Sequence, residues 1–535
     1  MTEQLVVAPM LVALVTAVGT LLARDRLRLS GWLSLAGGVA YLVAVAALFR
    51  AVVPVAVLDG ADASTAVLAY QLSGWPAPYG ITLVADALSA FMLAIAAVVS
   101  LPVLAFAVRY VDEYGQRLSF HPLYHFLMLG VSGAFLTGDL FNLFVWFEVL
   151  LMASYVLVVF YGGPQHTSAA LKYVVLNLVG GAFMLVAVGG LYATMGTLNM
   201  ADMARRLADP GRYGVDPVPV LGLTAVLFAV FALKVGLVPF QFWVPSAYRA
   251  APAPVAAVLA GVVKKVGVYA IVRVYFTVFG GGRVGTELAL PGFAGESFLS
   301  YFGPIMLVLA AASILLGGLG AVGQDDLDGL LAYSSIGQIG FVVLPLAVGA
   351  TAVDPTVRRL AVAAALVYAL NHAVAKALLF LVSGALFEAV GTVDLRELGG
   401  VARVDPTLAA GFFLGALALV GIPPLSGFFG KLLVFDVAVR GGSDIALGLG
   451  LGGAILTIVY ASLAWNRGFW GEPTEAVRRG TPGPALVAIV ALLAVAVLAI
   501  GVGFDPVFEA AGAAADAALA RGEYVDAVDP AEVSG

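Results

Sequence analysis

The amino-acid sequence predicts an all-α integral membrane protein with about fourteen transmembrane helices. Its 535 residues are 62% hydrophobic and only 11% charged, a composition that soluble globular domains do not have. Apolar runs of about 20 residues, the length that crosses a bilayer, recur along the chain. Because these runs lack strand-like alternation, they favour membrane-spanning helices over a closed barrel.

Each expected helix is an apolar run bounded by short loops that hold most of the charged residues. Two of the runs, 218–242 and 406–438, contain glycine and proline in their interior, and proline breaks a helix locally. These two are therefore expected to be interrupted spans. The expected helices, in chain order, are 5–23, 31–51, 83–107, 122–137, 139–161, 169–195, 218–242, 253–279, 301–322, 330–350, 358–388, 406–438, 446–470 and 483–503.

The sequence predicts one polytopic transmembrane domain, residues 1–503, followed by an acidic, alanine-rich tail, residues 504–535. The tail is expected to form a short helix that frays into flexible chain. One interrupted span with a nearby lysine occurs in each half of the domain, as in internally repeated transporters. Two inverted five-helix repeats are therefore expected, at about 122–279 and about 301–470.

Lysine and arginine are distributed differently along the chain. The arginines lie almost wholly in the short polar loops, whereas every lysine lies in or at the rim of a long apolar stretch. A buried lysine is able to release its proton near neutral pH, and arginine effectively is not. Ionisable residues at membrane depth typically mark proton or ion pathways. The six lysines are Lys172, Lys234, Lys264, Lys265, Lys376 and Lys431.

Glu148 and Lys234 are the first candidates for a proton path. Glu148 lies in the middle of an apolar run, and a lone buried carboxylate is costly unless it protonates or finds a cation. Lys234, just before the break at Pro239, is the expected cation. A lysine beside a carboxylate holds its proton and a separated one releases it more easily, so a small movement would switch its charge. The alternative is a static ion pair that only fixes helix packing.

The remaining candidates continue the path into the second half. Lys265 is expected to face the bundle interior, whereas its neighbour Lys264 points about 100° away and is expected near a loop or a partner. His372 and Lys376 share one helix face, which suits a proton relay; the alternative is a structural histidine beside a carbonyl-bound lysine. Lys431 follows the second break and is expected to end the path, unless it snorkels to the surface.

Composition also excludes several kinds of site and partner. The chain has no cysteine, which excludes thiolate metal sites and iron–sulfur ligands. Its four histidines are scattered, and His121, His125 and His166 are expected with Lys172 at the rim or surface, so neither a metal nor a cofactor is expected. The net charge of −6 argues against nucleic acid as a partner.

Five runs of sequence are similar to those of one known family. The runs 133–157, 172–204 and 265–274 lie in the first half, and HAVAKALLF (372–380) and GIPPLSGFFGKLL (421–433) lie in the second. They resemble the antiporter-like subunits shared by Mrp-type cation/proton antiporters and the membrane arm of respiratory complex I. The likeness is strongest to the D subunits of the Mrp antiporters, and it covers nearly the whole chain.

The resemblance implies a proton-translocating subunit of a multi-subunit Na+/H+ antiporter in the plasma membrane. It implies no enzyme activity in the subunit itself, and function only together with large and small partner membrane subunits. Two alternatives stay open: a proton-pumping subunit of a complex I-type or membrane-bound hydrogenase complex, and an inert assembly scaffold. In the family, the residues of the proton path match Glu148, Lys234, Lys265, His372, Lys376 and Lys431.

Overall fold

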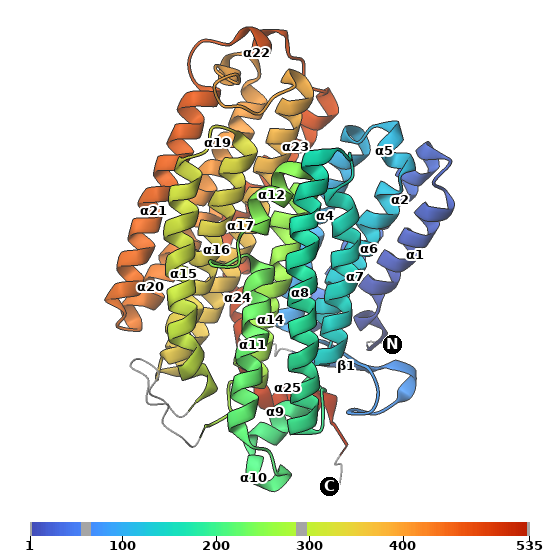
Figure 1. Ribbon diagram of the computed structural model, residues 1–535, viewed down its shortest axis with the longest axis vertical. Coiled ribbons are helices and arrows are strands. Elements are labelled where there is room, and N and C mark those ends of the chain that lie inside the picture. Colours follow the sequence, from blue (N-terminus) through green and yellow to red (C-terminus); the bar gives the residue numbers. More distant parts are fainter. Residues whose placement is uncertain (1–2, 55–65, 285–296, 532–535) are drawn as a thin grey trace.

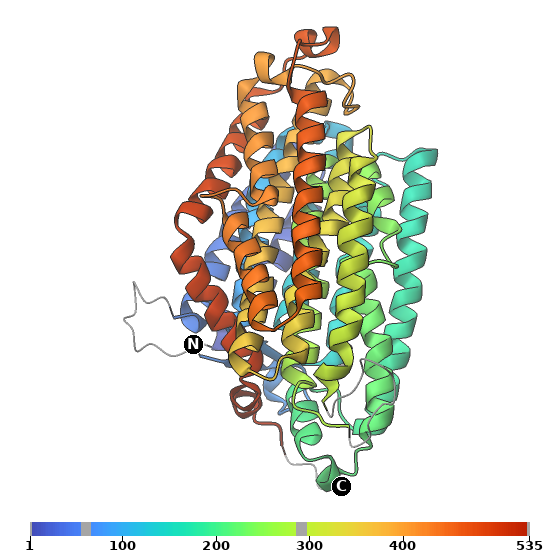
Figure 2. The same cartoon turned by 90° about the vertical axis from the view of Figure 1, so that its left-hand side faces the viewer.

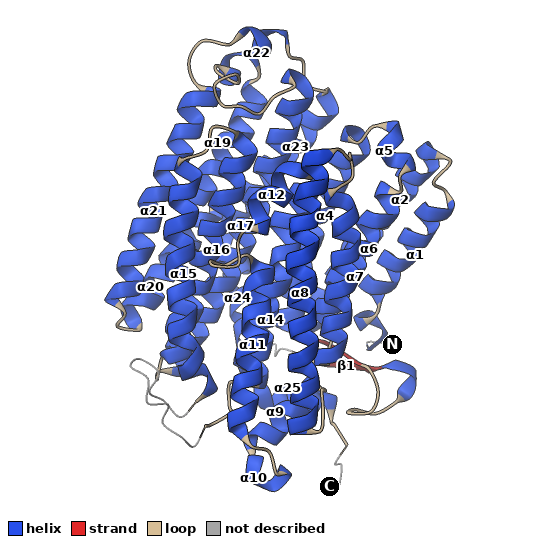
Figure 3. Cartoon of the chain, viewed as in Figure 1, coloured by secondary structure: helices blue, strands red, loops and turns tan. Residues whose placement is uncertain are grey.

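The computed structural model describes residues 3–54, 66–284 and 297–531, which form a bundle of long helices aligned with the long axis of the molecule (Figure 1). Nearly all of the regular structure is helical (Figure 3). Within these ranges, eleven helices are long and apolar enough to cross a membrane. Three shorter apolar helices accompany them: Ala8–Leu22, Phe120–Leu136 and Pro406–Val420.

The described first half of the bundle includes one small sheet, in which β1 pairs antiparallel with β2 and Leu68 lies opposite Ala85. Two of its short helices are 3₁₀ (η1, η2) and two are π-helical (η3, η4). In chain order the elements are η1 (Glu3–Val6), α1 (Ala8–Leu22), α2 (Leu27–Val52), β1 (Leu68–Gln71), η2 (Leu72–Gly74), β2 (Thr82–Ala85), α4 (Ala87–Tyr110), α5 (Glu113–Arg117), α6 (Phe120–Leu136), α7 (Leu140–Val158), α8 (Pro164–Met195), α9 (Met200–Ala208), α10 (Pro210–Tyr213), α11 (Pro217–Val235), α12 (Trp243–Ala250), α13 (Ala253–Val258), η3 (Leu259–Val263), α14 (Lys264–Ile271) and η4 (Val272–Val278).

The second half of the described chain is entirely helical apart from its loops. Its one π-helical stretch, η5, ends the span that begins with α21. The elements are α15 (Phe298–Val322), α16 (Leu327–Thr351), α17 (Pro355–Val390), α18 (Val401–Val404), α19 (Pro406–Val420), α20 (Ser426–Arg440), α21 (Asp444–Ala464), η5 (Trp465–Phe469), α22 (Glu475–Arg479), α23 (Pro484–Val502), α24 (Phe504–Leu519) and α25 (Arg521–Val528).

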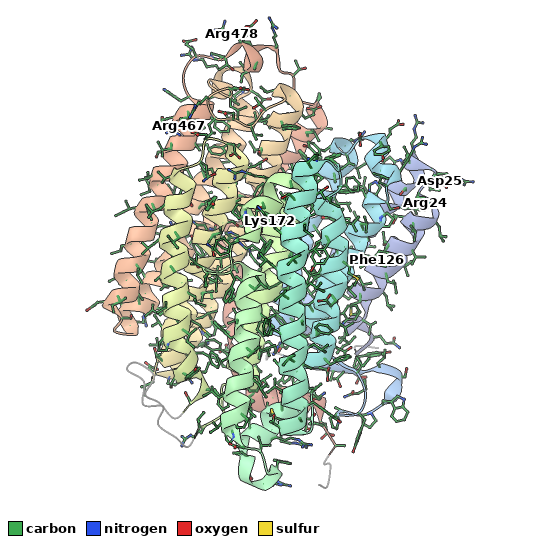
Figure 4. The ribbon with its side chains drawn as sticks, viewed as in Figure 1. Arg24, Asp25, Phe126, Lys172, Arg467 and Arg478 are labelled. Carbon is green, nitrogen blue, oxygen red and sulfur yellow. The ribbon has the colours of Figure 1, made fainter. Side chains whose placement is uncertain are left out.

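The helices divide into a buried centre and an apolar outer ring. The span made by α13, η3, α14 and η4 is buried throughout, and α16 and α17 are largely buried. Outer helices instead expose large apolar side chains, such as Val186 on α8 and Val495 on α23. An outer apolar surface is what a lipid environment requires. Arg24, Asp25, Arg467 and Arg478 lie toward the end of the bundle that carries α22 (Figure 4).

The sequence predicts a short helix that frays into flexible chain for the C-terminal tail. Its described part forms two helices, and the C-terminal segment runs along one side of the bundle toward the end that carries α9 and α10 (Figure 2). The alanine face of α24 is buried against α4 and α17, and the carbonyl of Ala518 accepts a hydrogen bond from Thr277 Oγ1 at 2.7 Å. Small side chains let the helix approach closely, so an alanine-rich stretch packs instead of fraying.

A buried ion pair joins three distant segments at this end of the molecule. Arg273 Nη2 in η4 donates to both carboxylate oxygens of Asp86, at 2.7 and 2.6 Å, and each side chain is 1% exposed. Asp86 also caps α4, because it accepts from the backbone N–H of Ser89 at 2.9 Å. The ring of Tyr524 in α25 covers the guanidinium, 4.8 Å from Cζ. The pair therefore fastens α4, η4 and the C-terminal helix together.

Both interrupted spans are broken where the sequence predicts. The first half-helix α11 stops at Gly236, and α19 stops at Gly421; both glycines have positive φ, of +76° and +91°. Glycine tolerates this left-handed conformation, which ends a helix. The chain resumes as α12 and α20 respectively. Each break leaves backbone carbonyls at the end of a half-helix inside the bundle.

The second break depends on the close approach of Gly427 to α19. A Cβ atom at Gly427 would lie 1.7 Å from the carbonyl oxygen of Ala418. We therefore expect Gly427→Ala to lower the melting temperature of the protein in detergent, at a cost of about 1–3 kcal/mol in folding free energy. Gly448→Ala is the matched control, because nothing lies within 4 Å of its Cβ position in α21. Equal melting temperatures for the two variants would contradict this packing argument.

Candidate functional site

The structure places five of the six lysines inside the bundle. Each of them is at most 4% exposed, and His372 is fully buried among them. Lys172, in contrast, is exposed on α8 (Figure 4). The buried lysines are Lys234, Lys264, Lys265, Lys376 and Lys431. They extend from the break between α11 and α12, through α14 and α17, to the break between α19 and α20.

Glu148 and Lys234 line the same small cavity, between α7, α8 and α11. Its volume is about 20 Å³, which is room for about one water molecule. Gly181 makes space for the carboxylate, because a Cβ there would lie 2.8 Å from Glu148 Oε1. Lys234 Nζ has no hydrogen-bond partner among the described residues, and it lies 5.4 Å from the ring centroid of Phe147. The two charged groups are neighbours across a cavity, not a closed ion pair.

The break in the first span positions Lys234. Lys234 lies in the last turn of α11, where the negative end of the helix dipole favours a cation. Trp243 Nε1, at the start of α12, donates to the carbonyl of Leu233 at 2.9 Å. Ser313 Oγ in α15 accepts from the N–H of Val238 at 2.9 Å. The broken segment is thus held in place by side chains from α12 and α15.

Lys265 and His372 meet in the centre of the bundle. Lys265 Nζ hydrogen-bonds to His372 Nδ1 and donates to the carbonyl of Ala260 at 2.9 Å. Ala260 lies in the π-helical stretch η3, and such stretches often occur at functional sites. His372 Nε2 lies 3.1 Å from Ser335 Oγ in α16. The histidine therefore connects a lysine of α14 with a hydroxyl of α16.

Lys376 lies one turn from His372 on α17 and reaches the same neighbouring helix. Its Nζ donates to the carbonyl of Leu331 at 2.8 Å and to Ser334 Oγ. Lys376 and His372 do not hydrogen-bond to each other. Lys376 donates to Ser334, whereas His372 hydrogen-bonds with the neighbouring Ser335. The two side chains face α16 together, as their spacing predicts.

A polar network that the sequence reasoning missed lies next along α16. Gln338 donates to Tyr460 OH at 2.8 Å and to Thr457 Oγ1 at 3.1 Å, both in α21. Its Oε1 accepts a hydrogen bond from Tyr368 OH in α17. The signal was present in the run LAYSSIGQIG, where serine and glutamine recur on one face of an apolar helix.

Lys431 lies at the second break and does not reach the surface. Its Nζ donates to the carbonyl of Val420, the last residue of α19, at 3.0 Å. It also lies 5.0 Å from the ring centroid of Phe341 in α16. Asn371 of α17 holds both sides of this break, accepting from Ser426 Oγ at 2.9 Å and donating to the carbonyl of Ala418 at 3.2 Å. The alternative that Lys431 extends to the membrane surface is therefore wrong.

Comparison with known proteins places this arrangement in a family. Residues 137–457 match the family described as NADH:quinone oxidoreductase/Mrp antiporter, TM. The chain is 38% identical to the D subunit of the Na(+)/H(+) antiporter of Alkalihalophilus pseudofirmus over 461 residues, 86% of this chain and 87% of that relative. The chain belongs to the NADH:quinone oxidoreductase/Mrp antiporter family.

Other members of the family are similar over most of their length. A chain of the Mrp complex from Dietzia sp. has the same fold, with a TM-score of 0.83 at 28% identity over 98% of this chain and 99% of that chain. The N subunit of NADH-quinone oxidoreductase from Desulforudis audaxviator is 34% identical over 443 residues, 81% of this chain and 83% of that relative. With eleven long apolar helices in its described ranges, this family member is a multi-pass membrane protein.

Two sequence expectations about other polar residues of this family member are wrong. Lys264, expected outside the bundle interior near a loop or a partner, is instead fully buried, since the whole span from α13 to η4 is enclosed by other helices. His121 and His125 are 1% and 3% exposed, because α6 packs against α1 and α2. His125 Nε2 lies 2.9 Å from Ser34 Oγ in α2. Periodicity alone did not show which faces of these spans meet other helices.

Proposed function

We propose that this chain is the proton-translocating subunit of a multi-subunit monovalent cation/proton antiporter that exchanges Na+ for H+ across the plasma membrane. The observation that carries the proposal is the line of buried lysines between the two broken helices, continued by His372 and the α16 network. Burying several cations has no advantage for packing, so a transport role accounts for it better. A relative of similar length is named as the D subunit of a Na(+)/H(+) antiporter.

The proposed path has an order. Protons enter a half-channel in the first half and reach Lys234, whose charge responds to Glu148 across their shared cavity. They cross the centre by Lys265, His372 and Lys376. They leave from Lys431 at the second break. The lysines at both breaks lie at the carbonyl end of a half-helix, where the helix dipole stabilises the protonated form.

The same proposal includes an internal repeat and fourteen spans. The repeats would be about 122–279 and about 301–470, inverted relative to each other, within a domain of residues 1–503. In both halves the fourth span is broken and the fifth ends in a π-helical stretch, η4 or η5, which supports this division. The three shorter apolar helices would complete the eleven long ones as spans.

The subunit is proposed to work by moving protons, with any redox chemistry left to partner proteins. Its partners would be the large and small membrane subunits of an Mrp-type complex, since a solved relative is a chain of such a complex. Within the described ranges, no group of three or more histidine, aspartate or glutamate side chains is close enough to hold a metal ion.

Antiport by the purified complex in lipid vesicles tests the proposal. Addition of Na+ should collapse an imposed pH gradient, followed with a pH-sensitive dye, and parallel runs with K+ and Li+ define the cation. Lys431→Ala should lower the rate by about a hundredfold, because the exit site loses its proton carrier. A wild-type rate in an assembled Lys431→Ala complex would count against the path, and a Lys172→Ala complex serves as the control for loss of a lysine.

A second function is favoured by the likeness to a NADH-quinone oxidoreductase subunit. In that case the same axis would pump protons, driven by redox reactions in partner subunits of a complex I-type or hydrogenase complex. Copurification distinguishes the two, since iron–sulfur or flavin proteins would accompany the chain only in the redox complex. An inert scaffold, the remaining alternative, would keep normal transport when the axis is mutated.

A further inference from the structure

Lys264 is a buried cation that the proposed path does not use. Its side chain is fully buried, and its Nζ has no hydrogen-bond partner among the described residues. It lies 5.8 Å from the ring centroid of Tyr248 in α12. A Cβ atom at Gly236, the residue that ends α11, would lie 3.4 Å from this Nζ. Lys264 therefore points at the first helix break, at Gly236. In the sequence, Gly236 follows Lys234 by two residues.

Several polar atoms without partners belong to the broken span and to Lys264 beside it. Four of the buried side-chain atoms that lack a hydrogen-bond partner in the described chain belong to α11, α12, the loop between them, and Lys264 itself. Buried unpaired polar groups are costly and rare, so their recurrence along one broken span calls for an explanation other than packing. The four atoms are Lys234 Nζ, Gln241 Oε1, Tyr248 OH and Lys264 Nζ.

Lys264 and Lys265 point from α14 toward two different neighbouring helices. Consecutive residues of a helix point about 100° apart, so the two lysines of α14 serve different neighbours. Lys264 faces the break that carries Lys234, and Lys265 hydrogen-bonds to His372 on α17. The path described above uses no group of α14 that faces the end of α11, and Lys264 is the lysine of α14 that does.

We propose that Lys264 is a proton carrier between Lys234 and Lys265, at the step where protons leave the first broken helix for the centre of the membrane. This inference rests on the proposed transport function. In the step, the N–H bond of the Lys234 ammonium breaks as Lys264 Nζ gains the proton, and Lys264 then gives it to Lys265. Like charges repel, so neighbouring lysines are not readily charged together, and each proton that arrives drives the previous one on toward His372.

A structural role for Lys264 predicts different behaviour. A cation held beside Tyr248 for packing would be replaced adequately by arginine, which stays charged. A space-filling role would be met by methionine, which has similar length and no charge. Neither arginine nor methionine replaces a proton carrier, because arginine does not release its proton and methionine does not bind one.

Antiport in vesicles with the whole purified complex tests the inference. Lys264→Met and Lys264→Arg should each lower Na+-driven proton exchange by at least about tenfold, with normal amounts of assembled complex. Lys265→Met and Lys172→Met are measured beside them. A wild-type rate in either Lys264 variant, with Lys265→Met inactive, overturns the role of Lys264 and leaves the proposed function standing. Full activity in Lys265→Met as well would instead overturn the proposed axis.

Discussion

Replacing Lys234 with alanine is expected to abolish Na+/H+ exchange while the complex still assembles. Lys234 is the buried cation at the first break, and the loss of a proton carrier there should lower the rate by about a hundredfold or more. Folding should survive, because Lys234 Nζ makes no hydrogen bond in the described part of the protein, and the half-buried Glu148, which loses its neighbouring cation, is able to take up a proton instead. Vesicle antiport and gel filtration of the complex measure the two effects separately.

Glu148→Gln is the companion variant. The amide keeps the shape of the side chain beside Gly181 but removes the charge that controls Lys234 across the cavity. We expect exchange to fall as far as in Lys234→Ala, since the protonation of Lys234 would no longer be coupled to Glu148. Asn142→Ala on the same helix, α7, is the control. Normal exchange by an assembled Glu148→Gln complex would remove the carboxylate from the mechanism.

Arg273→Met is expected to destabilise the folded protein strongly. The substitution leaves the carboxylate of Asp86 buried and without its cation, and breaking a buried ion pair on one side costs about 3–5 kcal/mol. It also removes the cation under the ring of Tyr524, so the C-terminal helix α25 should loosen. Thermal unfolding in detergent, together with proteolysis at the C-terminus, measures both effects.

Variants of Asp86 separate its two roles. Asp86→Asn keeps an oxygen that accepts from the N–H of Ser89 but leaves Arg273 without a counter-charge, whereas Asp86→Ala loses the cap as well. Asp86→Ala should therefore be the less stable by about 1 kcal/mol. The double variant Asp86→Asn with Arg273→Met should recover much of the loss, because no buried charge remains. A melting temperature unchanged in Arg273→Met would show that the pair contributes little.

The sequence predicted the interruptions and the buried lysines well because their causes are local. At each break a glycine is followed within three residues by proline, as in Gly236 and Pro239 or Gly421 and Pro424, and this local combination favours the end of a helix. A lysine within an apolar run has to enter the protein interior when the run spans a membrane. Lys431 shows this directly, since it closely follows the second break in an otherwise apolar segment and is buried there.

Contacts between helices were beyond the reach of the sequence. The expectation that only Lys265 of the two neighbouring lysines lies in the bundle interior was wrong, and so was the rim position of His121, because burial depends on which neighbours cover each helix face. The packing of the described part of the tail depends on neighbouring helices in the same way. An alanine-rich segment is disordered alone and packs well only where α4 and α17 offer a surface.

By itself the sequence determined that this protein is a helical membrane protein with charged residues at two broken spans. Hydropathy, helix-breaking residues and the cost of burying charge act along the chain, one segment at a time. Only the tertiary structure decided that Lys265 meets His372, that Glu148 faces Lys234 across a cavity, and that Lys264 points at the first break. Those relations depend on how α7, α11, α14 and α17 are rotated against one another, which packing between distant segments sets.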